Sequence, residues 1–238
     1  MFQKLSLKLR ESLLLPAYLI VAIWLVHLLQ VLSGFDLGWL GVYPLKGWGL
    51  RGVLFMPLLH GGWGHLLANT PPLFMLGAML VFFYRRVAFS SFIMIYLLSG
   101  LFTWLMPFQM AWHIGASAVL YGLWAFVLST GILRRNIRSI ALALIVLFYF
   151  GSMFVGIFPG GKEHVSWQGH LAGAIAGVFT AFWFREAIER DEEKPRYSWD
   201  EHPQEDAFFL NRDAFEKTKA EREQERQSGF PDWFSNKS

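Results

Sequence analysis

Ser117 is the residue of this sequence best placed to do chemistry, because it follows Gly115 by two positions at the start of an apolar stretch. A serine hydroxyl becomes a nucleophile when a base takes its proton, and imidazole has a pKa suited to that task at neutral pH. His170 begins a second apolar stretch, and His65 and Asn69 stand four residues apart in a third. Histidine and asparagine side chains can donate hydrogen bonds to a developing oxyanion. These residues predict a nucleophile, a base and an oxyanion-binding pair.

An acidic third member is missing from this set. No Asp or Glu occurs between Asp36 and Glu163. We therefore expect a Ser117–His170 dyad in which packing, and no carboxylate, positions the imidazole. Tyr121 lies one turn after Ser117 on the same helix face, where its ring could stack on His170.

Two glycines follow the histidine at the spacing of a close helix contact. Gly173 and Gly177 stand three and seven residues after His170. Small residues four apart let two helices approach closely in a membrane. We expect this face to bring the helix of the histidine against the helix of the serine.

The composition requires these residues to sit in a membrane protein. The chain has 238 residues, of which 54% are hydrophobic and 16% charged, and its apolar stretches are long enough to cross a bilayer. Lipid leaves the backbone no other solution than helix for such segments. We predict an all-α bundle with six transmembrane helices, at about residues 13–33, 65–84, 88–108, 115–133, 139–158 and 169–185.

Counting along these helices places the polar residues at one depth. Ser117, His170 and Asn69 stand 17, 15 and 16 residues before the first arginine at the end of their own helices. At a rise of about 1.5 Å per residue, all three lie about 22 to 26 Å from the same membrane face. Polar groups at that depth are costly unless they serve a function.

The charges set the orientation and separate a tail from the core. Residues 1–188 carry 12 Lys and Arg against four acids, and residues 189–238 carry nine against 14. Most basic residues of the core flank one set of helix ends, which predicts both termini in the cytoplasm and a site that opens to the outer face. We expect residues 189–238 to be a solvated, partly disordered tail with a short helix near 205–227. The basic balance of the core does not indicate nucleic acid.

Three motifs resemble the signatures of the rhomboid intramembrane serine proteases. They are HGGWGHLLAN at residues 60–69, GAS at 115–117 and GHLAGAIAG at 169–177, in the family's order on the second, fourth and sixth helices. The resemblance covers about residues 13–188. It implies a rhomboid-like bundle that hydrolyses peptide bonds in or beside the transmembrane segments of other proteins, in the bilayer and without a cofactor or metal. A bacterial inner membrane is the compartment that we expect.

Carried over residue by residue, the resemblance implies a role for each member of the site. Ser117 would be the nucleophile and His170 the general base and later acid. The oxyanion hole would comprise the His65 and Asn69 side chains and the Ser117 amide. His60 would tie the first loop to the entrance of the second helix. Tyr121 would support His170.

The sequence departs from the family pattern in three places. The usual glycine after the serine is Ala118, which we expect to be tolerated because alanine is small. Pro71 and Pro72 follow the oxyanion asparagine and predict a kink in the second helix. The Trp-Arg pair often seen in the first loop of the family appears only as separated Trp48 and Arg51, to which we assign no role. That loop, residues 34–64, is rich in Gly, Trp and Leu and is expected in the membrane interface.

Two other functions fit parts of the sequence. A catalytically inactive relative could bind or escort membrane proteins with the same fold, although it would have no need for all four site residues. A bis-histidine haem or metal protein could use some of the seven histidines, but no thiolate or carboxylate joins them in the membrane. His113 and His164, in outer loops, are rivals of His170 for the base. His27 is interpreted as a packing residue.

Overall fold

A computed structural model describes residues 2–160, 166–187 and 218–228. The chain divides into two compact units, Met1–Glu193 and Lys194–Ser238. Residues 188–217 lie outside the described residues, so the predicted boundary between 188 and 189 stays a prediction. The site residues all belong to the first unit.

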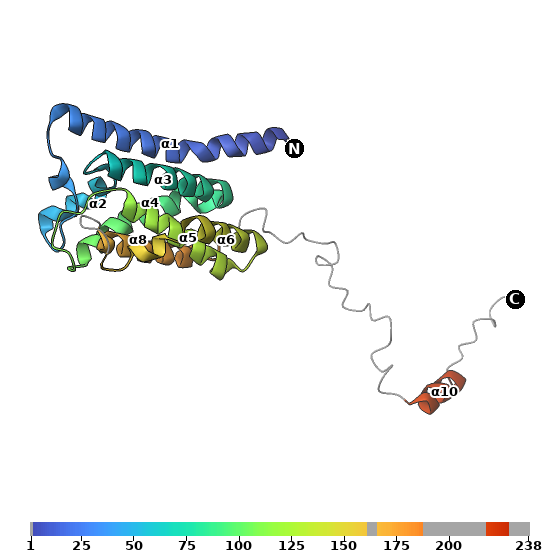
Figure 1. Cartoon of the computed structure of the whole chain (residues 1–238). Coiled ribbons are helices and arrows are strands. Elements are labelled where there is room, and N and C mark those ends of the chain that lie inside the picture. Colours follow the sequence, from blue (N-terminus) through green and yellow to red (C-terminus); the bar gives the residue numbers. More distant parts are fainter. Residues whose placement is uncertain (1, 161–165, 188–217, 229–238) are drawn as a thin grey trace. The chain divides into compact units, whose positions relative to one another are not determined.

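A helix occupies each of the six stretches that the sequence predicted, and the six lie side by side in a bundle (Figure 1). Four of them are long and apolar enough to cross a membrane. The bounds are α1 (Phe2–Ser33), α3 (Trp63–Phe83), α4 (Arg85–Leu105), α5 (Ser117–Arg134), α6 (Ile137–Phe150) and α8 (Trp167–Trp183).

The last two helices of the bundle are shorter than the others. The helix predicted over 139–158 ends at Phe150, and a separate turn of helix, α7 (Met153–Gly156), follows it. Gly151 is the C-cap of α6 and is consistent with the early end, because glycine disfavours helix. α6 has 14 residues and α8 has 17, which gives lengths of about 21 and 25 Å. Their crossing of the full membrane, and with it the count of six spans, stays a prediction.

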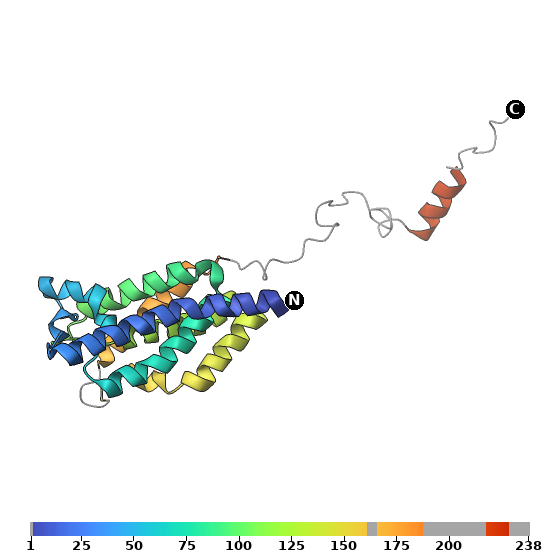
Figure 2. The ribbon, with the colours of Figure 1, turned by 90° about the horizontal axis from the view of Figure 1, so that it is seen from above.

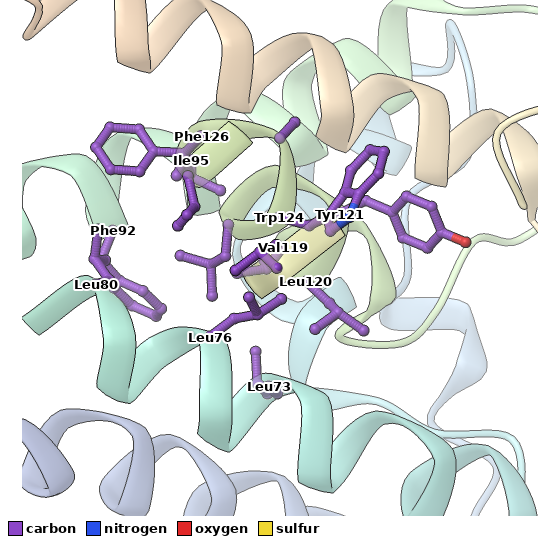
Figure 3. Close-up of a cluster of buried hydrophobic side chains, with 14 of the residues drawn as sticks. Leu73, Leu76, Leu80, Phe92, Ile95, Val119, Leu120, Tyr121, Trp124 and Phe126 are labelled. Atoms are coloured by element: carbon purple, nitrogen blue, oxygen red, sulfur yellow. The ribbon is translucent and has the colours of Figure 1, made fainter. Parts of the chain in front are cut away.

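α5 is the central helix of the bundle. It contacts α3, α4, α6 and α8, and two thirds of its length is buried. Figure 3 shows side chains of α3 and α4, among them Leu76 and Ile95, in one buried cluster with Val119 of α5. The helix that begins with Ser117 is therefore held on several sides at once.

α8 packs against α5 with almost no space between the two backbones. A methyl group on Gly173 would overlap the carbonyl oxygen of Ala118, and one on Gly177 would overlap that of Gly122. The side chain of Ala118 packs with Val42 and Met56 of the first loop. The methyl that replaces the family's usual glycine is thus accommodated in the contact between the loop and the bundle.

α1 lies along α3 (Figure 2). Gly77 of α3 packs on Pro16, and the Trp24 indole donates a hydrogen bond of 3.1 Å to the Thr70 hydroxyl. α3 continues as one helix through Pro71 and Pro72. The kink that the two prolines predicted stays a prediction.

Basic residues collect where α1 begins and where α3 meets α4. Arg85 forms an ion pair of 2.5 Å with Glu11 of α1. Arg134, at the end of α5, lies over the Tyr84 ring and donates to the carbonyl oxygen of Phe184 after α8. Four helix ends with basic residues therefore share one end of the bundle.

The first loop forms short helices that were not predicted from the sequence. It contains the short helices η1 (Gly38–Leu40), η2 (Gly47–Arg51), α2 (Gly52–Phe55) and η3 (Met56–Leu58). Arg51 donates two hydrogen bonds, of 2.7 and 3.2 Å, to the carbonyl oxygen of Trp39 and lies over its ring at 4.3 Å. Trp48 packs on Trp112 with ring centroids 4.9 Å apart. These two residues, left without a role in the sequence, join the first loop together and to the segment before α5.

In the second unit, α10 (Lys219–Ser228) is described. Thr218 and Glu221 form a capping pair, in which the Thr218 amide and hydroxyl donate to the Glu221 carboxylate at 2.7 Å. This helix overlaps the end of the predicted 205–227 helix, and residues 205–217 lie outside the described part.

Candidate active site

Ser117 is the first residue of α5 and is half-buried. Its position follows from Gly115, whose φ of +114° is a conformation that side-chain-bearing residues rarely adopt. A methyl on Gly115 would also overlap the ring of His65. The glycine two residues before the serine therefore turns the chain into α5 and lets His65 of α3 approach.

The start of α5 offers unpaired amides beside the serine. The first amides of a helix have no partner within it and carry the positive end of its dipole. The Ser117 amide is one of them, and negative charge that develops next to it would be stabilised.

His170 lies in the first turn of α8, and 8% of its surface is exposed. The Tyr121 ring of α5 stacks on it, with centroids 4.1 Å apart and planes 8° from parallel. The imidazole is thus placed by the helix that carries the serine.

A backbone carbonyl fixes the proton on the His170 ring. The Nδ1 atom lies 2.9 Å from the carbonyl oxygen of Gly156. A carbonyl can only accept, so Nδ1 carries the hydrogen and the neutral ring leaves Nε2 bare. This tautomer is the one that a general base needs, because Nε2 is free to take a proton.

Gly156 is a site residue that the sequence did not reveal. A methyl at this position would overlap the Tyr121 hydroxyl and approach Nδ1 of His170 to 3.3 Å. Its contribution is a carbonyl oxygen, which every residue possesses. The residue type at position 156 therefore gave no sign in the sequence that this residue would bind His170.

His65 and Asn69 lie one turn apart near the beginning of α3. The Asn69 amide nitrogen donates a hydrogen bond of 3.0 Å to the carbonyl oxygen of His65, and the residue is buried. One amide hydrogen of Asn69 remains for another partner. His65 lies against Gly115, so its ring stands beside the segment that leads to Ser117.

His60 lies against the same imidazole from the end of the first loop. The rings of His60 and His65 are 5.0 Å apart. His60 is fully buried, and burial together with the nearby His65 lowers the pKa of His60 to about 4. It is neutral at physiological pH and packs the loop against the entrance of α3.

The structure brings the serine and histidine helices together without closing the hydrogen bond between the two side chains. Within the described residues, no hydrogen bond joins the Ser117 hydroxyl to His170. Catalytic hydrogen bonds are often long before substrate binds. The contacts that relate the two residues are the Tyr121 stack and the packing of Gly173 on Ala118.

The remaining histidines lie elsewhere. His27 is buried on α1 with its ring edge against Trp63, at 4.7 Å. His113 is buried and faces Ser166. His164 lies outside the described residues. No three His, Asp or Glu side chains are grouped to hold a metal in the part of the chain that is described.

Comparison with known proteins identifies the family. The rhomboid domain matches residues 47–187, which include all three motifs. An uncharacterised protein of Mycobacterium tuberculosis is 42% identical over 177 residues, covering 68% of this chain and 71% of that protein. An uncharacterised protein of Mycobacterium leprae is 38% identical over 171 residues, covering 67% of this chain and 66% of that protein. The chain is therefore an integral membrane protein of the rhomboid family, as its three motifs predicted.

Proposed function

We propose that the protein is an intramembrane serine endopeptidase that uses a Ser117–His170 dyad. The observation that carries the proposal is the state of His170. Its ring is stacked on Tyr121 and bonded through Nδ1 to the Gly156 carbonyl, so its bare Nε2 belongs to a helix packed on the helix of the serine. A protein that only binds its partners has no use for an imidazole prepared in this way.

The proposed reaction is acyl transfer to serine followed by hydrolysis. Nε2 of His170 takes the Ser117 proton as Oγ attacks the scissile carbonyl. The other ring hydrogen stays on Nδ1 and continues to be donated to the carbonyl oxygen of Gly156. The resulting imidazolium gives its proton to the leaving amine as the peptide C–N bond breaks. Water then attacks the acyl-enzyme and gives a proton to Nε2 of His170. The bond between Ser117 Oγ and the acyl carbon breaks as the imidazolium returns this proton to Oγ, and the carboxylic acid product leaves.

Three donors would bind the oxyanion. They are the Ser117 amide at the start of α5, the free amide hydrogen of Asn69 and the His65 ring. The substrate would be a transmembrane segment that unwinds locally, because the amides of an intact helix are shielded by their own hydrogen bonds and side chains. No cofactor or metal takes part in this scheme.

We propose that all six helices cross the bilayer and that both termini lie in the cytoplasm. The basic helix ends beside Glu11, Tyr84 and Phe184 would then face inward. The site at the start of α5 and α8 would open to the outer face.

One labelling experiment tests both the chemistry and the orientation. A membrane-impermeant fluorophosphonate, applied to intact spheroplasts that express the protein, should form an adduct at Ser117, and Ser117→Ala should lose it. Loss of labelling should coincide with loss of cleavage of a single-span reporter protein. Labelling only of inside-out vesicles would contradict the orientation, and a Ser117→Ala variant that still cleaves the reporter would contradict the nucleophile.

A further inference from the structure

A second serine–histidine pair, His113 and Ser166, lies beside the site. The arrangement is reversed between the two pairs, because the chain that leads into α5 supplies the serine of one pair and the histidine of the other. His113 stands four residues before Ser117, and Ser166 stands four residues before His170. The Nδ1 atom of His113 is 2.5 Å from the Ser166 hydroxyl. In this outer pair the segment before α5 supplies the histidine, and the segment before α8 supplies the serine.

The direction of each hydrogen bond in the outer pair follows from its partners. Nε2 of His113 lies 3.0 Å from the carbonyl oxygen of Gln109, so Nε2 carries the hydrogen. Burial lowers the pKa of His113, which favours the neutral ring with Nδ1 bare. The Ser166 hydroxyl must then donate to Nδ1.

Ser166 passes this contact on to the first turn of α8. Its hydroxyl oxygen accepts from the Gly169 amide at 3.0 Å, as the N-cap of the helix. Its carbonyl oxygen accepts from the amide of His170 itself at 3.1 Å. The residue held by His113 therefore binds the backbone of the proposed base and of its neighbour.

His113 is itself fixed by contacts that do not involve α8. Its backbone exchanges two hydrogen bonds with Val42, of 2.8 and 3.0 Å. Two residues later, the Gly115 amide donates to the carbonyl oxygen of Met56 at 2.9 Å. The first loop thus anchors the segment from His113 to Ser117 as one piece.

A glutamine pair braces the same junction. Gln168 is fully buried, and its side-chain oxygen accepts from the Gln109 amide at 2.6 Å. Its side-chain nitrogen donates to the carbonyl oxygens of Thr103 and Met106 at the end of α4. These bonds hold the start of α8 to α4 and to Gln109, and the hydrogen bond between His113 and Ser166 ties it to the segment just before the nucleophile.

We propose that His113 is a positioning residue of the reaction, which through Ser166 sets the first turn of α8 and so the placement of His170 relative to Ser117. This inference rests on the proposed function. The Ser166 hydroxyl donates to His113 and accepts from the Gly169 amide, so in this structure it joins the segment before α5 to the start of α8.

Two substitutions of His113 separate the two nitrogens of the ring. Asparagine places an acceptor oxygen near the position of Nδ1 and keeps the contact with Ser166. Glutamine places a donor near Nε2 and keeps the contact with Gln109, but offers nothing at Nδ1. The variants His113→Asn and His113→Gln therefore form a matched pair that differs in the contact under test.

Turnover and KM for a single-span reporter in proteoliposomes should separate the pair. We expect His113→Gln to lower kcat about 10-fold with KM unchanged, as for the loss of one hydrogen bond that acts on the reacting geometry. His113→Asn should stay within about threefold of wild type. Ser166→Ala should resemble His113→Gln, Ser166→Thr should restore turnover, and the double variant Ser166→Ala with His113→Gln should lose no more than either alone.

Amide hydrogen exchange gives a readout that does not depend on catalysis. The amides of Gly169 and His170 should exchange faster in His113→Gln than in wild type, and at the wild-type rate in His113→Asn. Thermal unfolding of the same samples identifies any variant that has lost the fold. The exchange and turnover data are then compared only among folded variants.

The outcomes divide cleanly. Lower kcat with faster exchange in His113→Gln, and neither in His113→Asn, supports the positioning role. Equal turnover in the two variants overturns it, as does faster exchange with unchanged kcat, which would limit the pair to stability. A fluorophosphonate adduct on Ser166 would also overturn it. A wild-type protein without cleavage would refute the proposed function, and unchanged exchange in His113→Gln would then refute the contact as well.

Discussion

The two serine–histidine pairs of this protein are built from the same residue types and differ in how fully their hydrogen bonds are used. In the outer pair, His113 and Ser166 have partners for each polar atom of their side chains. In the inner pair, His170 has a partner for Nδ1 alone, and Ser117 is half-buried at a helix start. A pair whose polar atoms are all hydrogen-bonded within the protein holds two segments together. A pair with a free imidazole nitrogen and a free hydroxyl keeps both groups for a substrate.

Removal of the inner base tests this comparison most severely. His170→Ala should lower turnover about 10⁴-fold, because the Ser117 hydroxyl loses the group that takes its proton. Hydrolysis of a single-span reporter by purified, reconstituted protein measures the effect. Near-wild-type turnover in this variant would show that another residue is the base. The proposed difference in role between the two pairs would then be wrong.

Loss of an oxyanion donor should have the next largest effect. Asn69→Ala removes one side-chain donor and should lower kcat about 100-fold with a smaller change in KM. Thr70→Val, next in the sequence, removes a hydroxyl that bonds within α3 and to Trp24, and serves as the control. Equal losses of turnover in the two variants would point to damage of α3 and away from an oxyanion role.

A methyl at Gly156 should give the smallest of the three losses of kcat. It tests how closely the ring of His170 must be placed. Gly156→Ala would push on the Tyr121 hydroxyl and on Nδ1 of His170, and should lower kcat about 10-fold to 100-fold by misplacing the ring. Gly47→Ala adds the same methyl to open space in the first loop and should be silent. If Gly156→Ala matches Gly47→Ala in kcat, the close packing of Gly156 on Tyr121 and His170 does not limit the placement of the base.

The parts of the fold set by long apolar runs were predictable from the sequence. A helix stands in every predicted stretch, because lipid allows little else for such residues. The end of α6 was predicted too late because hydrophobic residues continue past Phe150, whereas the helix ends at Gly151. The order within the first loop escaped prediction, since it depends on contacts such as Arg51 with the Trp39 carbonyl, which join residues twelve positions apart.

The site divides in the same way. Side chains that announce their chemistry, Ser117, His170, His65 and Asn69, could be proposed from type and spacing. The acceptor for His170 could not, because a backbone carbonyl has no signature in a sequence. His113 was visible only as a rival base, and its contact with Ser166 joins residues 53 positions apart, which no local pattern encodes.

The carbonyl of Gly156 has a practical consequence for anyone who maps this protein by exchanging side chains. Such scans erase functional groups one by one, but this group belongs to the main chain and survives every replacement. At position 156 such a scan would show only that larger side chains do not fit. The hydrogen bond from His170 to the carbonyl would be detected only if the peptide bond itself were altered.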